Sequence, residues 1–180
     1  PSSGKYNATV GGPVGYADRS TIENCTNRCT VTWNGYVGGI AGSNRNSNII
    51  GCANLGDVSG SSSQNSAGGI CGKIDGDGSD GVAVTIRDCY NVGTITGRAA
   101  GGIAGGSSGD IDVLIANCYN VGNSDGKNYT GEIIGDSYGS RSTTVDNCYY
   151  LDAASNKVVG DDKATVTKTE PKSIREFADG

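Results

Sequence analysis

A short glycine motif recurs five times along the 180-residue chain and constrains the fold more than any other feature. In its regular form it reads Gly-Gly-Ile-Ala-Gly, as at 38–42 and 101–105. The copies start 27 to 33 residues apart, at Gly11, Gly38, Gly68, Gly101 and Gly131. Glycine on both sides of a short apolar run is typical of a strand bounded by tight turns. Self-similarity at this period predicts a stacked repeat architecture.

Two further residue types recur at fixed offsets within each repeat. A β-branched residue lies three positions before a cysteine, which gives the column Cys25, Cys52, Cys89, Cys118 and Cys148. Two residues later comes an asparagine, which gives the column Asn27, Asn54, Asn91 and Asn120, with Tyr150 in the last repeat. Stacked amides can hydrogen-bond to one another along a solenoid, so we expect an asparagine ladder.

These columns predict an all-β fold, a parallel β-solenoid (β-helix) of about five three-strand coils over residues 1–150. The segments Val58–Gly60 and Ile95–Gly97 mark the third strand of a coil. Residues 151–180 are expected to form a C-terminal extension, with a short helix near its end that caps the open end of the solenoid. A β-sandwich also accommodates evenly spaced short strands, but it does not explain the columns.

Composition excludes several classes of function. The net charge is −5 and lysine and arginine are scattered, which disfavours nucleic acid and anionic membranes as partners. No apolar run is long enough to span a bilayer. The chain has seven cysteines, no histidine and no Cys-x-x-Cys, so we interpret the cysteine column as structural and not as zinc ligands. Because methionine is absent, we expect the chain to be part of a longer protein.

The strings Val37–Gly42, Ala67–Gly72 and Asn117–Gly122 resemble the glycine-rich GLUG repeat of bacterial surface proteins. The resemblance covers about residues 10 to 150 and departs from the pattern at Pro13, Glu132 and Tyr150. It implies a region similar to those in large secreted adhesins, or in the non-catalytic parts of immunoglobulin A-specific peptidases. It supplies no catalytic residue.

The longest insertion, Lys73–Gly81, contains the sharpest candidate site. Asp75, Asp77 and Asp80 alternate with glycine and serine, as oxygen ligands do in loops that bind calcium. The glycine and the bidentate acid of a helix-loop-helix calcium site are displaced or missing. A solvated acidic turn therefore fits the same string.

Three other groups of residues are candidates. Tyr90, Tyr119 and Tyr149 follow the column cysteines, so they should form an outward aromatic strip that binds a sugar or a peptide, or that packs between coils. Asp110 and Asp112 point the same way from an extended strand, as a general acid and base do, although surface charge explains them equally. Cys25 and Cys29 are near enough in sequence to bridge a turn, and Cys71 is expected as buried filler.

The sequence therefore favours a non-enzymatic extracellular module of a bacterial surface protein, acting in adhesion, in ligand presentation or as a stalk. Its expected partner is a host or surface glycan or protein. A β-helix polysaccharide lyase or hydrolase is the alternative, and it requires a groove lined by aspartate with arginine or lysine across adjacent coils. The accessory region of a secreted peptidase is a third possibility. No cofactor is expected apart from calcium.

Overall fold

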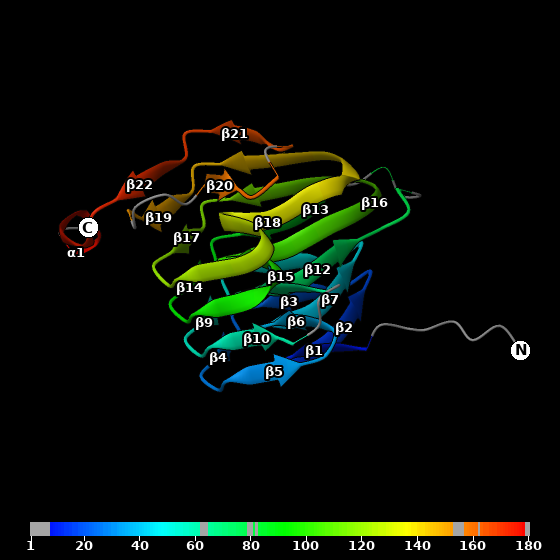
Figure 1. Ribbon diagram of the computed structural model, residues 1–180. Coiled ribbons are helices and arrows are strands. Elements are labelled where there is room, and N and C mark those ends of the chain that lie inside the picture. Colours follow the sequence, from blue (N-terminus) through cyan, green and yellow to red (C-terminus); the bar gives the residue numbers. More distant parts are fainter. Residues whose placement is uncertain are drawn as a thin grey trace, which may run out of the picture.

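A computed structural model describes residues 8–61, 65–78, 81, 83–152, 157–161 and 163–178. The described chain winds into stacked coils whose strands pair with the equivalent strands of the coils above and below (Figure 1). Each strand pair is parallel. The predicted β-solenoid of about five coils, with a single short C-terminal helix, is confirmed.

The first two coils each contain five short strands. The first coil holds β1 (Thr9–Gly11), β2 (Val14–Asp18), β3 (Thr21–Glu23), β4 (Thr26–Asn27) and β5 (Val31–Trp33). The second holds β6 (Tyr36–Gly38), β7 (Ala41–Arg45), β8 (Asn48–Ile50), β9 (Ala53–Asn54) and β10 (Val58–Gly60). Three strands per coil was an underestimate, because left-handed residues such as Asn24 and Gly51 break the run between the isoleucine and the cysteine.

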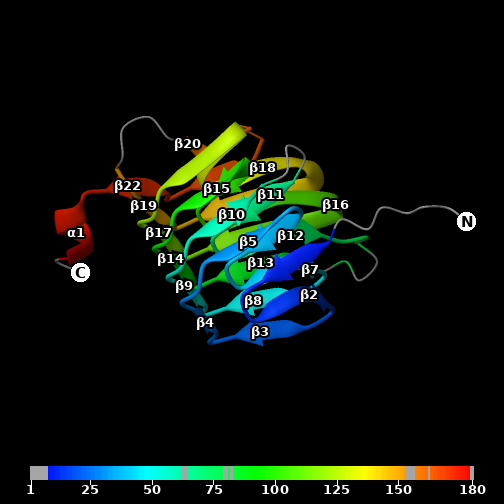
Figure 2. The same cartoon turned by 60° about the horizontal axis from the view of Figure 1, so that its bottom comes forward.

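In the later coils neighbouring strands merge. The third coil holds β11 (Ser66–Gly68), β12 (Cys71–Asp75), β13 (Val84–Arg87), β14 (Tyr90–Asn91) and the start of β15 (Ile95–Gly101). The next two coils hold β16 (Ala104–Ala116), β17 (Tyr119–Asn120), β18 (Ser124–Asp146) and β19 (Tyr149–Leu151). The strands form two sheets, and the smaller one runs β4, β9, β14, β17, β19 and β22 in spatial order (Figure 2).

The strand register confirms the residue columns. Ile22 pairs with Ile49, which pairs with Ile86, and Ile86 pairs with Ile115. All four are buried, and the column cysteines Cys52, Cys89, Cys118 and Cys148 are fully buried beside them. A core of stacked β-branched residues and thiols thus replaces the large interlocking side chains of a globular domain.

The glycine that ends each motif brings two backbones into direct contact. A Cβ atom on Gly72 would lie 2.6 Å from the carbonyl oxygen of Gly42 and 2.6 Å from backbone atoms of Val37. Only a residue without a side chain permits this approach. The contact divides the interior, because Val37 belongs to a small cluster with Val58 and Ile95, whereas Ile40 belongs to the main core. We call this contact between the two backbone layers the glycine waist.

The predicted asparagine ladder is confirmed. The side-chain amide of Asn27 donates to Oδ1 of Asn54, Asn54 donates to Asn91, and Asn91 donates to Asn120, each at 2.8 Å. Each amide also donates to a backbone carbonyl two residues further on, as Asn91 does to Gly93 at 2.8 Å. The second glycine of the first four motifs makes room for the ladder, since a Cβ on Gly12 would lie 2.8 Å from Oδ1 of Asn27.

The two irregular residues of the fifth repeat compensate for each other at the end of the ladder. Asn120 donates to Oε2 of Glu132 at 2.7 Å, so this carboxylate replaces the amide that Tyr150 lacks. Glu132 stands where the other motifs have their second glycine, and it is only 2% exposed. The replacement of glycine by Glu132 and the replacement of asparagine by Tyr150 are therefore linked, because the carboxylate supplies the acceptor that the tyrosine does not.

Strand pairing continues beyond Tyr150. The strands β20 (Lys157–Val159) and β21 (Thr165–Thr167) pair with β18, and β22 (Glu170–Lys172) pairs with β19. Thr169 takes the place of the column cysteine, and its Oγ1 accepts from the amide of Cys148 at 3.1 Å. The segment expected as a C-terminal extension thus adds a partial coil. Its column positions carry other residue types, so the repeat pattern does not reveal this coil in the sequence.

The helix α1 (Ile174–Ala178) follows this partial coil. Ser173 and Glu176 form reciprocal hydrogen bonds at its start, with Ser173 Oγ donating to Glu176 Oε2 at 2.7 Å. We expected the helix over the open end of the solenoid. Instead it lies beside the smaller sheet, because the Phe177 ring packs 6.0 Å from that of Tyr119 (Figure 1).

Substitution of Gly72 by alanine tests the glycine waist. Because the new Cβ would overlap backbone atoms that cannot rotate away, Gly72→Ala is expected to lower the free energy of unfolding by about 1–3 kcal/mol. Urea denaturation measures this loss. Gly60→Ala is the matched control, since the atoms nearest its Cβ would lie 3.7 Å away. Equal effects of the two substitutions would contradict a steric role for Gly72.

A double-mutant cycle tests the end of the ladder. Glu132→Gly leaves Asn120 without its acceptor, and Tyr150→Asn brings an amide to a position that the carboxylate already fills. Each is expected to be destabilising alone, whereas the double variant restores the regular motif. We expect a favourable coupling of about 0.5–3 kcal/mol between the two sites, measured by urea unfolding of all four proteins. Additive effects would show that Glu132 does not replace the missing amide.

Candidate functional site

Two adjoining surface pockets run across the coils along the glycine waist. The first is about 210 Å³ in volume and the second about 630 Å³, and they share Tyr36 and Lys73. One wall consists of the residue that directly follows the invariant glycine in each coil, namely Tyr16, Ser43, Lys73, Gly106 and Asp136. The facing wall includes Thr9, Tyr36 and Ser66, which are aligned in successive coils. We call this feature the waist groove.

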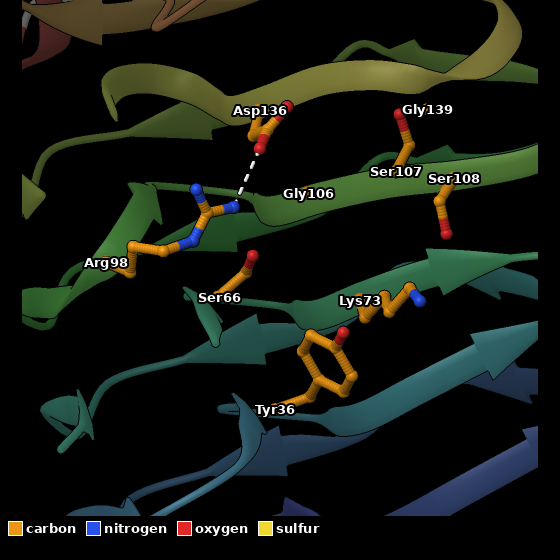
Figure 3. Close-up of a pocket in the computed structure, with 9 residues that line it drawn as sticks. All are labelled: Tyr36, Ser66, Lys73, Arg98, Gly106, Ser107, Ser108, Asp136 and Gly139. Atoms are coloured by element: carbon orange, nitrogen blue, oxygen red, sulfur yellow. Dashed lines mark hydrogen bonds and ion pairs between the residues drawn. The ribbon is translucent and has the colours of Figure 1, made fainter. Parts of the chain in front are cut away.

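The waist groove holds two cationic side chains, each beside a carboxylate and an aromatic ring. The Lys73 ammonium lies 4.8 Å from the centre of the Tyr36 ring and 3.9 Å from Oδ2 of Asp75. The Arg98 guanidinium lies 2.8 Å from Oδ2 of Asp136 and 5.4 Å from the centre of the Tyr129 ring (Figure 3). Lys73, Arg98 and Asp136 are each about one-fifth to one-quarter exposed, so they are held in place and still reach solvent.

Arg98 lies opposite an irregularity in the strand pairing. The register between β15 and β18 shifts between Gly97 and Ala99, where the single residue Arg98 faces the two residues Lys127 and Asn128 of β18. The extra residue therefore belongs to β18, and such a bulge locally disrupts the ladder beside Arg98. Small residues line the groove near it, with Gly106, Ser107, Ser108 and Gly139 in the same pocket (Figure 3). Ser107 is buried and its Oγ donates to Oγ of Ser140 at 3.1 Å, which fixes this side of the groove.

The aromatic strip forms in part as expected. The Tyr90 and Tyr119 rings stack with their centres 4.9 Å apart and their planes 3° from parallel. Phe177 extends this row, and burial, followed by the charge of Tyr90, raises the pKa of Tyr119. Tyr149 instead carries Lys172 5.2 Å above its ring and donates from its hydroxyl to Asn147. The strip is partly covered by the helix, and binding of a ligand there stays a prediction.

The aspartates of the insertion have protein partners. Oδ2 of Asp77 lies 2.7 Å from Arg45, and Asn46 donates to its Oδ1 at 3.1 Å. Asp75 accepts from the backbone of Gly76 at 2.9 Å and faces Lys73. Asp80 lies outside the described residues. Within the described part of the chain, no three histidine, cysteine, aspartate or glutamate residues are arranged to hold a metal ion.

The pair considered as a general acid and base is held by one arginine. Asp110 lies 2.9 Å from Nε of Arg141, and Asp112 lies 3.5 Å from its NH1. The Arg141 guanidinium lowers the pKa of Asp110, and Asp112 also accepts from Ser142 at 2.6 Å. Both carboxylates are exposed, and neither lines the waist groove. The geometry thus matches the surface-charge interpretation of this pair.

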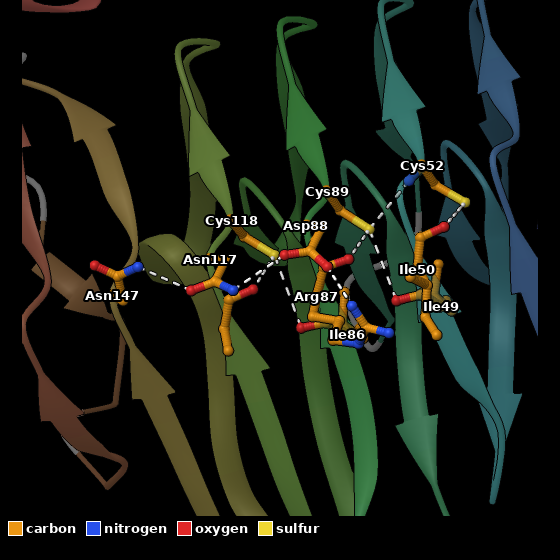
Figure 4. Close-up of polar contacts among 11 residues, drawn as sticks. Ile49, Ile50, Cys52, Ile86, Arg87, Asp88, Cys89, Asn117, Cys118 and Asn147 are labelled. Atoms are coloured by element: carbon orange, nitrogen blue, oxygen red, sulfur yellow. Dashed lines mark hydrogen bonds and ion pairs between the residues drawn. The ribbon is translucent and has the colours of Figure 1, made fainter. Parts of the chain in front are cut away.

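All seven cysteines are free, including Cys25 and Cys29, for which a bridge was considered. Cys25 instead donates from its thiol to the carbonyl of Glu23 at 3.4 Å. Cys71 is fully buried as expected, and burial raises the pKa of its thiol to about 12. The column thiols donate to backbone carbonyls, as Cys89 does to Arg87 at 3.1 Å (Figure 4). These contacts support a structural role for the column.

A second, exposed amide row lies next to the cysteine column. Asn147 donates to Asn117 at 2.8 Å, and Asn117 donates to Asp88 at 3.0 Å (Figure 4). All three residues have a positive φ, between 50° and 57°, which asparagine and aspartate tolerate better than most residues. This row fixes the turn before each cysteine and thereby the direction of the strand that follows.

No protein-family model matches the chain, and no curated protein and no solved structure shows significant similarity to it. No helix in the described part of the chain is long and apolar enough to cross a membrane. The waist groove therefore has to be interpreted from its own residues.

One column of the repeat indicates the waist groove in the sequence. The position directly after the invariant glycine holds a different residue in each of the five repeats, whereas the glycine itself is constant. Because side chains alternate along a strand, this position is expected on the opposite face from the buried residue that follows it, such as Asn44 or Ile74. The facing wall and the contribution of Arg98 follow only from the fold.

Proposed function

We propose that this chain is a non-enzymatic, extracellular repeat module of a large bacterial surface protein, which acts in adhesion or ligand presentation through the waist groove. The observation that carries the proposal is the column directly after the invariant glycines. The glycines are constant, and the five different residues that follow them line a groove that extends over five coils. A groove of this length suits an elongated ligand on a glycan or a protein better than a compact metabolite.

The extracellular location and the bacterial surface protein rest on the resemblance of the glycine motifs to the GLUG repeat. A stalk role requires only the stacked coils. Ligand presentation requires a surface such as the waist groove, and for this reason we favour it.

A polysaccharide lyase or hydrolase is the second candidate, and one observation favours it. The waist groove combines aspartate with lysine and arginine across adjacent coils, which is the arrangement that such an enzyme requires. We favour binding over catalysis because each cation is already beside a carboxylate, as Arg98 is beside Asp136 at 2.8 Å. Such pairs position a ligand through hydrogen bonds but leave no isolated base.

Binding and chain cleavage measured on the same samples separate these functions. We expect the labelled protein to be retained by at least one glycan or protein on an array of bacterial and host surface ligands. The double variant Tyr36→Ala/Arg98→Ala is expected to lose this retention, because it removes one aromatic ring and one cation of the groove. No new reducing ends or unsaturated products are expected from soluble polysaccharides.

Thermal unfolding of the double variant controls for loss of the fold. Release of oligosaccharides by the wild type that Lys73→Ala abolishes would establish the enzyme instead. Retention on no array component by the wild type would leave only a stalk.

A further inference from the structure

The waist groove has no net charge, although it is rich in charged side chains. Its ionisable lysine, arginine and acidic residues are Lys73, Asp75, Arg98 and Asp136, two cations and two carboxylates. They lie in two pairs, with separations of 3.9 Å and 2.8 Å. The whole chain carries a net charge of −5. A polyanion would be repelled by the chain and would have to compete with carboxylates of the protein for both cations.

The same groups suit a polymer that is rich in hydroxyls. A hydroxyl both donates and accepts hydrogen bonds, so it can bond to a carboxylate and to the adjacent cation without displacing either. Serine hydroxyls and the tyrosine side chains add further donors and acceptors. Tyr16 is 53% exposed and offers an open ring, against which the apolar face of a sugar can pack.

The orientation of the strands argues against a peptide in the groove. An extended peptide binds best by adding a strand to an open sheet edge. In the groove the described strands beyond the first coil already pair on both sides, as β7 does with β2 and β12, and only β1 and β2 of the first coil have an open edge. A ligand along the solenoid axis thus crosses the strands and contacts mainly side chains.

The spacing of the coils favours an extended glycan. Coils stack at the separation of paired strands, about 4.8 Å. This separation is similar to the length of one pyranose residue along an extended β-1,4-linked chain. Successive sugars would then meet equivalent positions of successive coils, first Tyr16, then Ser43, then Lys73.

From these observations we infer that the waist groove binds a neutral, extended β-linked polysaccharide along the solenoid axis, with about one sugar per coil. The inference rests on the proposed binding function and specifies its ligand class. The charge pairs act as hydrogen-bonding groups, and Tyr16 and Tyr36 contact sugar rings at the end of the groove nearest the N-terminus.

Affinity electrophoresis of the full chain tests this inference. The gels contain a neutral polysaccharide (hydroxyethylcellulose, mixed-linkage β-glucan, xylan or galactomannan) or an acidic one (polygalacturonate, alginate or hyaluronate). We expect retardation by at least one neutral polymer, equal at low and high salt, because no net charge is involved. Tyr16→Ala and Tyr36→Ala should each raise the dissociation constant at least about tenfold.

Two variants sharpen the test. Tyr90→Ala makes the same change on the aromatic strip and should leave the binding unchanged. Asp136→Ala leaves Arg98 without its carboxylate, so this variant should gain affinity for polygalacturonate that salt abolishes.

Preferential binding of the acidic polymers by the wild type would overturn the inference and leave the proposed binding function standing. Neutral binding that depends on Tyr90 and not on Tyr16 or Tyr36 would also overturn it, because the site would then be the strip. If no polysaccharide is bound, the neutral-glycan inference fails, and the array described above decides whether a protein ligand keeps the proposed function.

Discussion

The backbone contact at the glycine waist is the constraint on which the rest of the structure depends. Where Gly72 meets the backbone of Val37, two strand layers approach more closely than any side chain permits. This contact separates the small valine and alanine cluster from the main isoleucine and cysteine core. It also directs the flanking residues outward, so the same glycines that allow the fold create the groove.

The buried asparagine ladder sets the alignment of each coil with the next along the solenoid axis. The amides from Asn27 to Asn120 are buried and hydrogen-bonded in series, so a shift of one coil against the next would leave several of them unpaired. Glu132 ends the series with a carboxylate because Tyr150 supplies no amide. The ladder therefore tolerates a change of chemistry at its end, provided that the acceptor is kept.

The repeated columns of the sequence were sufficient to predict the solenoid, the buried thiols and the amide ladder, since each follows from one residue type at a fixed offset. They were insufficient where a position keeps its place in the coil but carries another residue type. Thr169 takes the place of the cysteine, and Lys168 has the positive φ that Asn147 has one coil earlier, so the last partial coil was missed. The position of α1 depends on the contact of Phe177 with Tyr119. The waist groove includes Arg98, which lies opposite a bulge in β18 and forms an ion pair with Asp136.

We propose that the residues directly after the invariant glycines form a ligand-binding surface beside the glycine waist. Amide chemical shifts of the isotope-labelled chain, recorded during titration with a soluble β-1,4-linked neutral oligosaccharide, would locate such a surface. We expect shifts that cluster at Tyr16, Ser43, Lys73, Gly106 and Asp136 and at their neighbours across the groove, one set per coil. Shifts confined to Tyr90, Tyr119 and Phe177, or no shifts at saturating oligosaccharide, would contradict binding in the waist groove.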